Sequence, residues 1–351
     1  MTTKRTIQEP IDLTYKILVI TALLFTGAYF FGQIFMPFLF ALILSLALLP
    51  SCQRLEGIGF NRFFSIFTVL IVLSVIVLGF GTFFYWQFKN FASDLPKLSV
   101  KSTQLISEWL QSIENSLGIS LDDPMTQIQD NLSGILQTSS GILQGTFSTV
   151  SQFFTFLVMV PVYTFFILYS RNRLRVFIEH QNRKGRKRDY LGLVDDIKDS
   201  VRDYLKGMSI VILIIAALNT TGLLIIGIDY AILLGVFSAL LTVIPYVGVV
   251  IGALIPIFVA FITKDSLIYP VAVVGLYSLV QFLEGNLITP RILGNTVHLN
   301  PLIIILGLVM AGYLAGIPGM IIAVPVLAII KIAFEHSRTF SSVATLLGEK
   351  E

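Results

Sequence analysis

The chain has little charge. Asp, Glu, Lys and Arg make up 13% of its 351 residues, whereas hydrophobic residues make up 55%. Soluble domains carry roughly 25% charged residues, and a spanning helix needs roughly 20 apolar residues in a row. Uncharged runs of about that length or longer are 17–53, 63–88, 131–170, 207–228, 230–263, 266–283 and 292–330. The composition therefore predicts an all-α polytopic integral membrane protein.

Several sequence features are missing, and each absence argues against a class of protein. The single cysteine, Cys52, excludes an intramolecular disulfide and argues against a cysteine-based metal site. Without a Walker A lysine loop or a His-Glu-x-x-His motif, the chain resembles neither an ATP-driven pump nor a metalloprotease. Only three histidines are present, and no nucleophile–base set is evident. We therefore expect no enzymatic activity and no cofactor. A polar start without an A-x-A-like site also predicts no cleaved signal peptide.

The positions of the basic residues predict the topology, because Lys and Arg near spanning segments mark the cytoplasmic side. Basic residues precede the first apolar run, recur at Arg54 and Arg62, and are densest between 171 and 188. Acidic residues outnumber lysines between 87 and 150, which indicates an external region. Both termini are then cytoplasmic, which requires an even number of crossings. About eight transmembrane helices is the economical count.

The expected segments follow from this topology. Residues 17–52 form a helical hairpin, with its turn at Gly32, Gln33 and Pro37, and amphipathic stripes mark two helical stretches outside the membrane. Each stripe packs against its own domain or against another subunit, and both alternatives stay open. In order, the segments are a cytoplasmic N-terminus (1–16), transmembrane helices 1–3 (17–86), an external amphipathic insertion (87–149), transmembrane helix 4 (150–170), a cytoplasmic basic and amphipathic segment (171–207), a C-terminal transport core (208–336) and a cytoplasmic tail (337–351).

Two C-terminal apolar segments, 230–263 and 300–331, are interrupted by proline and glycine. A proline inside a helix removes a backbone donor and clashes with the preceding turn, so both segments should be kinked, discontinuous or re-entrant. The two resemble one another, through either duplication or composition alone. Paired interrupted segments of this kind indicate the central site of a transporter. The expected hinge positions are Pro245, Gly248, Pro256, Pro290, Pro318 and Pro325.

The stretch that begins at Gln281 holds the main candidates for transport chemistry. Glu284 closely follows an uncharged helix, and Arg291 lies seven residues later, beyond Asn286. Ionisable groups within membrane segments are costly, which makes them candidates for function. Glu284 is then a carboxylate coupled to a proton or cation, with Arg291 as its counter-charge. Alternatively, both side chains lie in a surface loop and extend into the lipid headgroups.

Other polar residues allow two interpretations each. Asn219 lies inside an uncharged helix and either hydrogen-bonds a neighbouring helix or faces the solute. His298 either relays protons or is a solvated or capping residue. Asn300 and Pro301 form an N-cap and N1 pair, which explains them structurally. The basic run at 171–188 orients the chain and contacts anionic membrane lipids rather than nucleic acid.

These motifs together resemble the AI-2E (autoinducer-2 exporter) family over almost the whole chain. The residues that carry the resemblance are Pro245-Tyr-Val-Gly248, Glu284-Gly-Asn286-x-x-x-Pro290-x-x-x-Gly294 and Leu299-Asn300-Pro301. The resemblance implies a secondary transporter of the bacterial inner membrane, which forms homo-oligomers, pentamers in particular, and moves in an elevator-like manner. Members are linked to export of autoinducer-2 or to sodium/proton antiport. The positions carried over as site or gating elements are Pro245, Glu284, Asn286, Pro290 and Arg291.

The sequence thus predicts a transporter of a small polar solute or a cation, with its site between the broken segments 230–263 and 281–331. Two other classes stay open. A passive channel at an oligomer axis would show ohmic currents without saturation. A non-transporting membrane scaffold would lose function when the amphipathic stripe 98–117 is altered and would move no solute.

Overall fold

The fold is that of a computed structural model, which describes residues 35–117, 156–180, 190–264, 266–294, 299–337 and 341–348. Side chains are described for all of these except residue 92, residues 94–117 and residues 341–342. Within these ranges the chain is helical apart from short turns and contains no strand. Among the described residues, five helices are long and apolar enough to cross a membrane: Phe35–Gly57, Arg62–Phe91, Tyr190–Ile226, Ile268–Ile292 and Pro301–Glu335. The prediction of an all-α polytopic membrane protein is confirmed.

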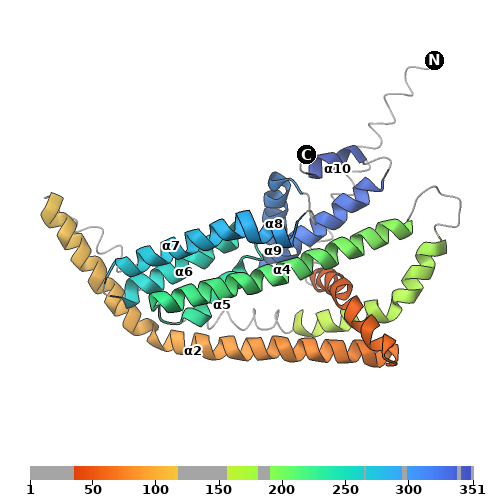
Figure 1. The fold of residues 1–351 in the computed structure, drawn as a ribbon, viewed down its shortest axis with the longest axis horizontal. Coiled ribbons are helices and arrows are strands. Elements are labelled where there is room, and N and C mark those ends of the chain that lie inside the picture. The colour runs from red at the N-terminus through yellow and green to blue at the C-terminus, as the bar shows by residue number, and fades with distance from the viewer. Residues whose placement is uncertain are drawn as a thin grey trace, which may run out of the picture. The chain divides into compact units, whose positions relative to one another are not determined.

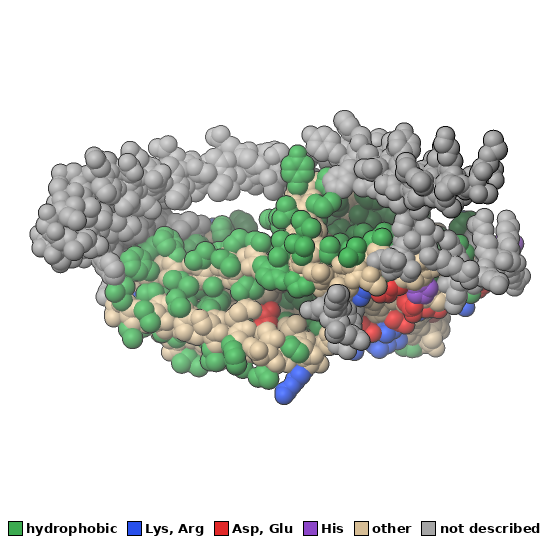
Figure 2. Space-filling view, turned by 90° about the horizontal axis from the view of Figure 1, so that it is seen from above, with side chains coloured by type: hydrophobic (Ala, Val, Ile, Leu, Met, Phe, Trp, Pro, Cys, Tyr) green, Lys and Arg blue, Asp and Glu red, His purple; other side chains and the backbone are tan. Residues whose placement is uncertain are grey.

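The surface of the described residues is consistent with a lipid environment. Large apolar side chains are exposed along whole helices, for example Val72, Phe80 and Trp86, which are 53%, 53% and 60% exposed. Hydrophobic side chains dominate the described surface in Figure 2. Apolar patches of this extent are rare on soluble monomers, whereas helices within a bilayer present them to lipid or to neighbouring subunits.

Backbone contacts divide the chain into two units. The first unit comprises Met1–Ile66, Val158–Arg202 and Val297–Glu351, and the second comprises Phe67–Leu157 and Asp203–Thr296. Helices α2 (Arg62–Leu117) and α4 (Tyr190–Ile226) contribute residues to both. Helix α2 continues from the predicted membrane segment, which ends at 86, into the predicted insertion as far as Leu117; its stretch long and apolar enough to cross a membrane is Arg62–Phe91. The helix passes through Pro96 without ending there.

In the first unit, the helix Phe35–Gly57 packs against the helix at 156–180. Phe38 and Tyr163 make an edge-to-face ring contact at 5.9 Å, and Arg171 forms an ion pair with Glu56. Pro37, expected in a turn, lies within the helix Phe35–Gly57, while Gly32 and Gln33 lie outside the described residues.

Helix α9 (Pro301–Glu335) of the first unit is a hairpin (Figure 1). As expected, Asn300 is its N-cap, accepting a hydrogen bond from the Leu302 amide at 3.0 Å, and Pro301 is its first residue. Gly316, at φ 62° and ψ −146°, interrupts the helix. A Cβ atom on Gly307 would lie 2.6 Å from Leu327 Cδ1, although these residues would be about 30 Å apart in a straight helix. The two arms therefore fold back against each other.

The second unit contains a similar hairpin, formed by α5 (Ala231–Leu241) and α6 (Val247–Thr263). Its turn contains Pro245 and Tyr246, the latter at φ 64°. At the opposite end, Lys264 Nζ and Asp229 Oδ2 form an ion pair at 3.3 Å. Arms of 11 and 17 residues are shorter than the roughly 20 that span a bilayer. The prediction that both C-terminal segments are broken or re-entrant is thus confirmed.

Gly248 permits the close turn between α5 and α6, and this generates a prediction. A Cβ atom on Gly248 would overlap the carbonyl of Leu241. We expect Gly248→Ala to lower the free energy of unfolding by about 1–3 kcal/mol, as overpacking does elsewhere. Denaturation in mixed micelles measures this. Gly79→Ala is the matched control, because nothing lies within 4 Å of a Cβ there. Equal stability of both variants would contradict the close approach.

Candidate functional site

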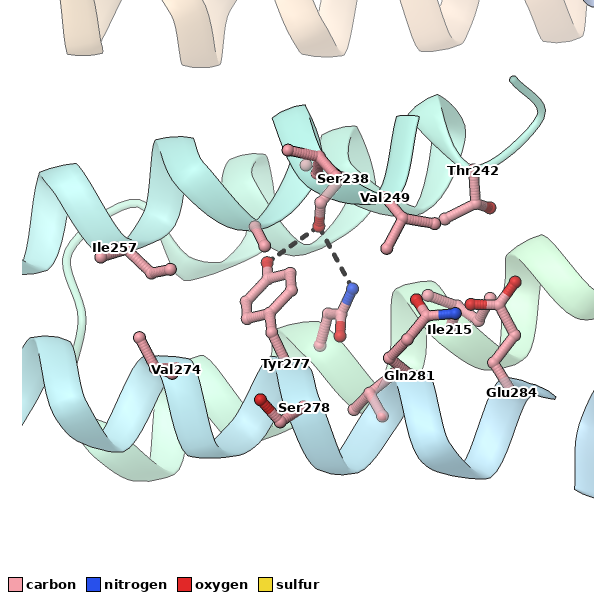
Figure 3. A pocket seen from close by; sticks show the side chains of 15 residues that line it. Ile215, Ser238, Thr242, Val249, Ile257, Val274, Tyr277, Ser278, Gln281 and Glu284 are labelled. Carbon is pink, nitrogen blue, oxygen red and sulfur yellow. Dashed lines mark hydrogen bonds between the residues drawn. The ribbon is translucent and has the colours of Figure 1, made fainter. Parts of the chain in front are cut away.

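The second unit contains a cavity of about 340 Å³ between α4, α5, α6 and α7 (Ile268–Leu283) (Figure 3). Apolar side chains form most of its wall, and a few polar groups converge on it. The lining residues are Ile215, Asn219, Ser238, Thr242, Val249, Val250, Gly252, Ala253, Ile257, Val274, Tyr277, Ser278, Val280, Gln281 and Glu284.

Close helix contacts hold the wall of the cavity together. Ile215 and Asn219 are four residues apart on α4 and therefore share one face of that helix. Glycines let neighbouring helices approach: Gly235 of α5 lies against Thr220, and Gly222 of α4 lies against Leu276 of α7. Small residues play this part at helix contacts within membranes. The polar side chains are thus carried by a rigid, packed frame.

A chain of hydrogen bonds joins three helices at the cavity. Asn219 Nδ2 on α4 donates to Ser238 Oγ on α5 at 3.2 Å, and Ser238 Oγ lies 2.9 Å from the hydroxyl of Tyr277 on α7 (Figure 3). Asn219 and Ser238 are 2% and 3% exposed. Ser238 and Tyr277 were not predicted as site residues. The only signal for them was a hydroxyl group within an otherwise apolar hairpin arm and an apolar helix.

The carbonyl oxygen of Asn219 has no hydrogen-bond partner in the part of the chain that the structure describes. Among the described residues, none donates to Asn219 Oδ1, although the atom is buried in the cavity wall. A buried polar atom without a partner costs about 1–3 kcal/mol, so its presence requires an explanation. The cavity wall thus carries a hydrogen-bond acceptor that no described residue satisfies.

Glu284 lies at one end of the same cavity, half-buried, where α7 passes into the π-helix η1 (Glu284–Ile288). The side chain of Gln281, also in the lining, lies beside that of Glu284 (Figure 3). Short π-helical segments occur frequently at functional sites. The structure thus brings Glu284 and Asn219 to one cavity.

The other polar candidates lie elsewhere. Asn286 is exposed and donates to the Phe282 carbonyl at 2.8 Å, and Arg291 is exposed on α8 (Thr289–Ile292). Neither lines the cavity. Within the continuously described stretch 266–294, no ion pair joins Glu284 to Arg291. His298 lies outside the described residues.

The expected hinge residues are distributed over both units. Pro245 lies in the turn of the α5–α6 hairpin, Gly248 in the first turn of α6, and Pro256 is buried inside α6. Pro290 is near the start of α8. Pro318 and Pro325 belong to the second arm of α9, in the first unit. Within the described parts of the chain, no three His, Cys, Asp or Glu residues are grouped to hold a metal ion.

Known transport proteins match this chain over nearly its whole length. The AI-2E family transporter model matches residues 18–339. The putative transport protein YrrI of Bacillus subtilis is 26% identical, with 94% of this chain and 98% of that protein covered. The putative transport protein YueF of the same organism is 28% identical, with 87% and 84% covered. The AI-2 transport protein TqsA of Escherichia coli is 25% identical, with 92% of each covered.

The separation of Glu284 from Arg291 generates a prediction about stability. Because no ion pair joins them, the destabilisations caused by Glu284→Gln and Arg291→Ala should add in the double variant within about 0.5 kcal/mol. Denaturation of the four proteins in mixed micelles measures this. A double variant more stable than the sum of the singles by over about 1 kcal/mol would instead reveal a direct pairing.

Proposed function

This chain belongs to the AI-2E transporter family, and from that membership we propose that it is a secondary transporter whose solute binds in the cavity between α4, α5, α6 and α7. The observation that supports this most is the buried, unpartnered carbonyl oxygen of Asn219 in the cavity wall. In a membrane protein such an atom is tolerated where a wet cavity or a ligand satisfies it.

The shape and lining of the cavity favour a small organic solute. A cavity of about 340 Å³ lies within the range of about 300–1,000 Å³ that is typical of small-molecule sites. A mostly apolar wall with a few convergent polar groups is typical of small-molecule sites. TqsA is named for AI-2 transport. We propose that this chain exports a small polar solute of the autoinducer-2 type.

Glu284 supplies a means of coupling in this proposal. Its carboxylate shares the cavity with the solute-facing groups, so it can take up a proton from outside when the solute leaves. Exchange of a cation for protons is the second candidate. Two oxygen donors, Glu284 and Asn219 Oδ1, line the same cavity, and hard cations prefer oxygen ligands.

The proposed setting is the bacterial inner membrane, with both termini cytoplasmic. A re-entrant hairpin enters and leaves on one side of the bilayer. If segments 230–263 and 300–331 are re-entrant hairpins and not crossings, the eight predicted crossings become six, which is still an even number. The proposed partners are membrane lipids and further copies of this chain in a homo-oligomer, with the pentamer implied by the family resemblance. The long apolar surfaces of α2 and other helices support both kinds of partner.

Reconstitution into liposomes tests the function. We expect purified protein to release trapped autoinducer-2, with faster release when the outside is more acidic and with alkalinisation reported by an external pH dye. Glu284→Gln should abolish the dependence on the pH gradient, because the amide cannot take up a proton. A sodium gradient imposed on the same vesicles tests the second candidate through the same dye.

The matched control is Glu335→Gln. Glu335 is a carboxylate of the first unit that pairs with Lys331 at 3.6 Å, so it lies outside the cavity. Its replacement should leave transport within about twofold of wild type, a margin of about 0.4 kcal/mol. Protein that releases no autoinducer-2 and gives no pH signal with either gradient would refute both candidates.

A further inference from the structure

Ser238 lies at the centre of the hydrogen-bond chain in the cavity wall. A serine hydroxyl offers one hydrogen and two lone pairs. Ser238 Oγ donates to the Gly235 carbonyl at 3.1 Å and accepts from Asn219 Nδ2 at 3.2 Å. The Tyr277 hydroxyl lies 2.9 Å away, and either hydroxyl can donate in that contact. Whether its hydrogen goes to Gly235 or to Tyr277, Ser238 acts as the acceptor toward Asn219.

This arrangement decides how the Asn219 amide is turned. The two ends of an asparagine amide are told apart by their partners. Because Ser238 can only accept, the NH₂ end must face it, and the carbonyl oxygen is left in the cavity wall without a donor. With an apolar residue at 238, nothing would distinguish the two orientations. In one of the two orientations, the Asn219 NH₂ group would take the place of the carbonyl oxygen in the cavity wall.

We propose that Ser238 is a positioning residue that holds the Asn219 amide so that its carbonyl oxygen accepts a hydrogen bond from an O–H or N–H group of the transported solute. The inference rests on the proposed function, in which the cavity binds that solute. The inference restricts the solute to molecules with an O–H or N–H group that can reach the Asn219 carbonyl oxygen, such as a hydroxylated neutral compound.

The packing around Ser238 explains why a serine serves here. A Cβ atom added to Gly252 of α6 would lie 3.0 Å from Ser238 Cβ, so the two helices meet with no space between them. A larger side chain at 238 would separate the hairpin arms, while alanine fits but has no hydroxyl. Ser238→Ala therefore removes the hydroxyl without adding bulk.

A double-mutant cycle on transport kinetics tests the inference. We expect Ser238→Ala and Asn219→Leu each to raise the KM for autoinducer-2 about three- to tenfold, the value of one oriented hydrogen bond, while Vmax stays within about twofold. Ser238→Ala should cause no further rise in KM once Asn219 is already leucine, because Ser238 acts only through Asn219. A purely structural role would instead lower Vmax and the yield of folded protein in both variants, without a selective rise in KM.

Ser45→Ala is the matched control. Ser45 is 2% exposed and donates to the Leu42 carbonyl three residues earlier at 2.7 Å, as Ser238 does to Gly235, but it lies in the first unit. Its KM should equal that of the wild type. Two results would refute the role of Ser238 while leaving the proposed function intact, provided that wild-type protein moves autoinducer-2. In one, Ser238→Ala leaves KM unchanged; in the other, the rises in KM caused by Ser238→Ala and Asn219→Leu multiply in the double variant. If wild-type protein does not move autoinducer-2, the proposed solute fails, and the inference fails with it.

Discussion

Within a lipid bilayer, every backbone N–H and C=O group must find its partner inside the protein. Both C-terminal apolar segments of this chain break their helices, at Pro245 and Tyr246 in one and at Gly316 in the other. At the first break, local bonds supply some partners, such as that from the Gly248 amide to the Ile244 carbonyl at 2.9 Å. In both segments one helical arm folds back onto the other. Glycines make that contact close enough, since Gly248 lies against the Leu241 carbonyl and Gly319 against the Ala311 carbonyl.

The hairpin in the second unit also shapes the cavity. Its arms contribute Ser238 from α5 and Gly252 from α6, and helices α4 and α7 close the remaining wall. Placing a hydroxyl within this hairpin links it to Asn219 and Tyr277 on two other helices. In the low dielectric of a membrane interior such links are strong when satisfied and costly when broken. A solute that contacts the Asn219 side chain would thus contact a group that is hydrogen-bonded to Ser238 of the hairpin.

Composition and periodicity predicted the class of fold, the interrupted segments, and the N-cap at Asn300, because each depends on local chemistry. They could not tell a kink from a reversal. Proline and glycine permit both, and the deciding contacts, such as Gly307 with Leu327, join residues twenty positions apart. Asn219 and Glu284 were singled out because polar groups in apolar helices are rare. Ser238 and Tyr277 gave no comparable signal, since single hydroxyl groups are common in such helices.

Arg291 was predicted as the counter-charge of Glu284 because it is the next charged residue along the chain. Seven residues separate it from Glu284, and in a regular α-helix that spacing returns a side chain to nearly the same face. The π-helix Glu284–Ile288 lies between them, and its i→i+5 bonding holds more residues in each turn. Arg291 is exposed on α8, and within the described stretch 266–294 no ion pair joins it to Glu284.

Solute protection of an introduced cysteine can show where the solute binds. Cys52 is the only cysteine in the sequence and is buried, so its replacement by alanine gives a background free of thiols. Ser278 is exposed on α7 and lines the cavity, whereas Val72 lies on the exposed surface of α2. Saturating autoinducer-2 should slow maleimide labelling of Ser278→Cys and leave that of Val72→Cys unchanged. Equal labelling rates at Ser278→Cys with and without the solute, in protein that transports it, would place the binding site elsewhere.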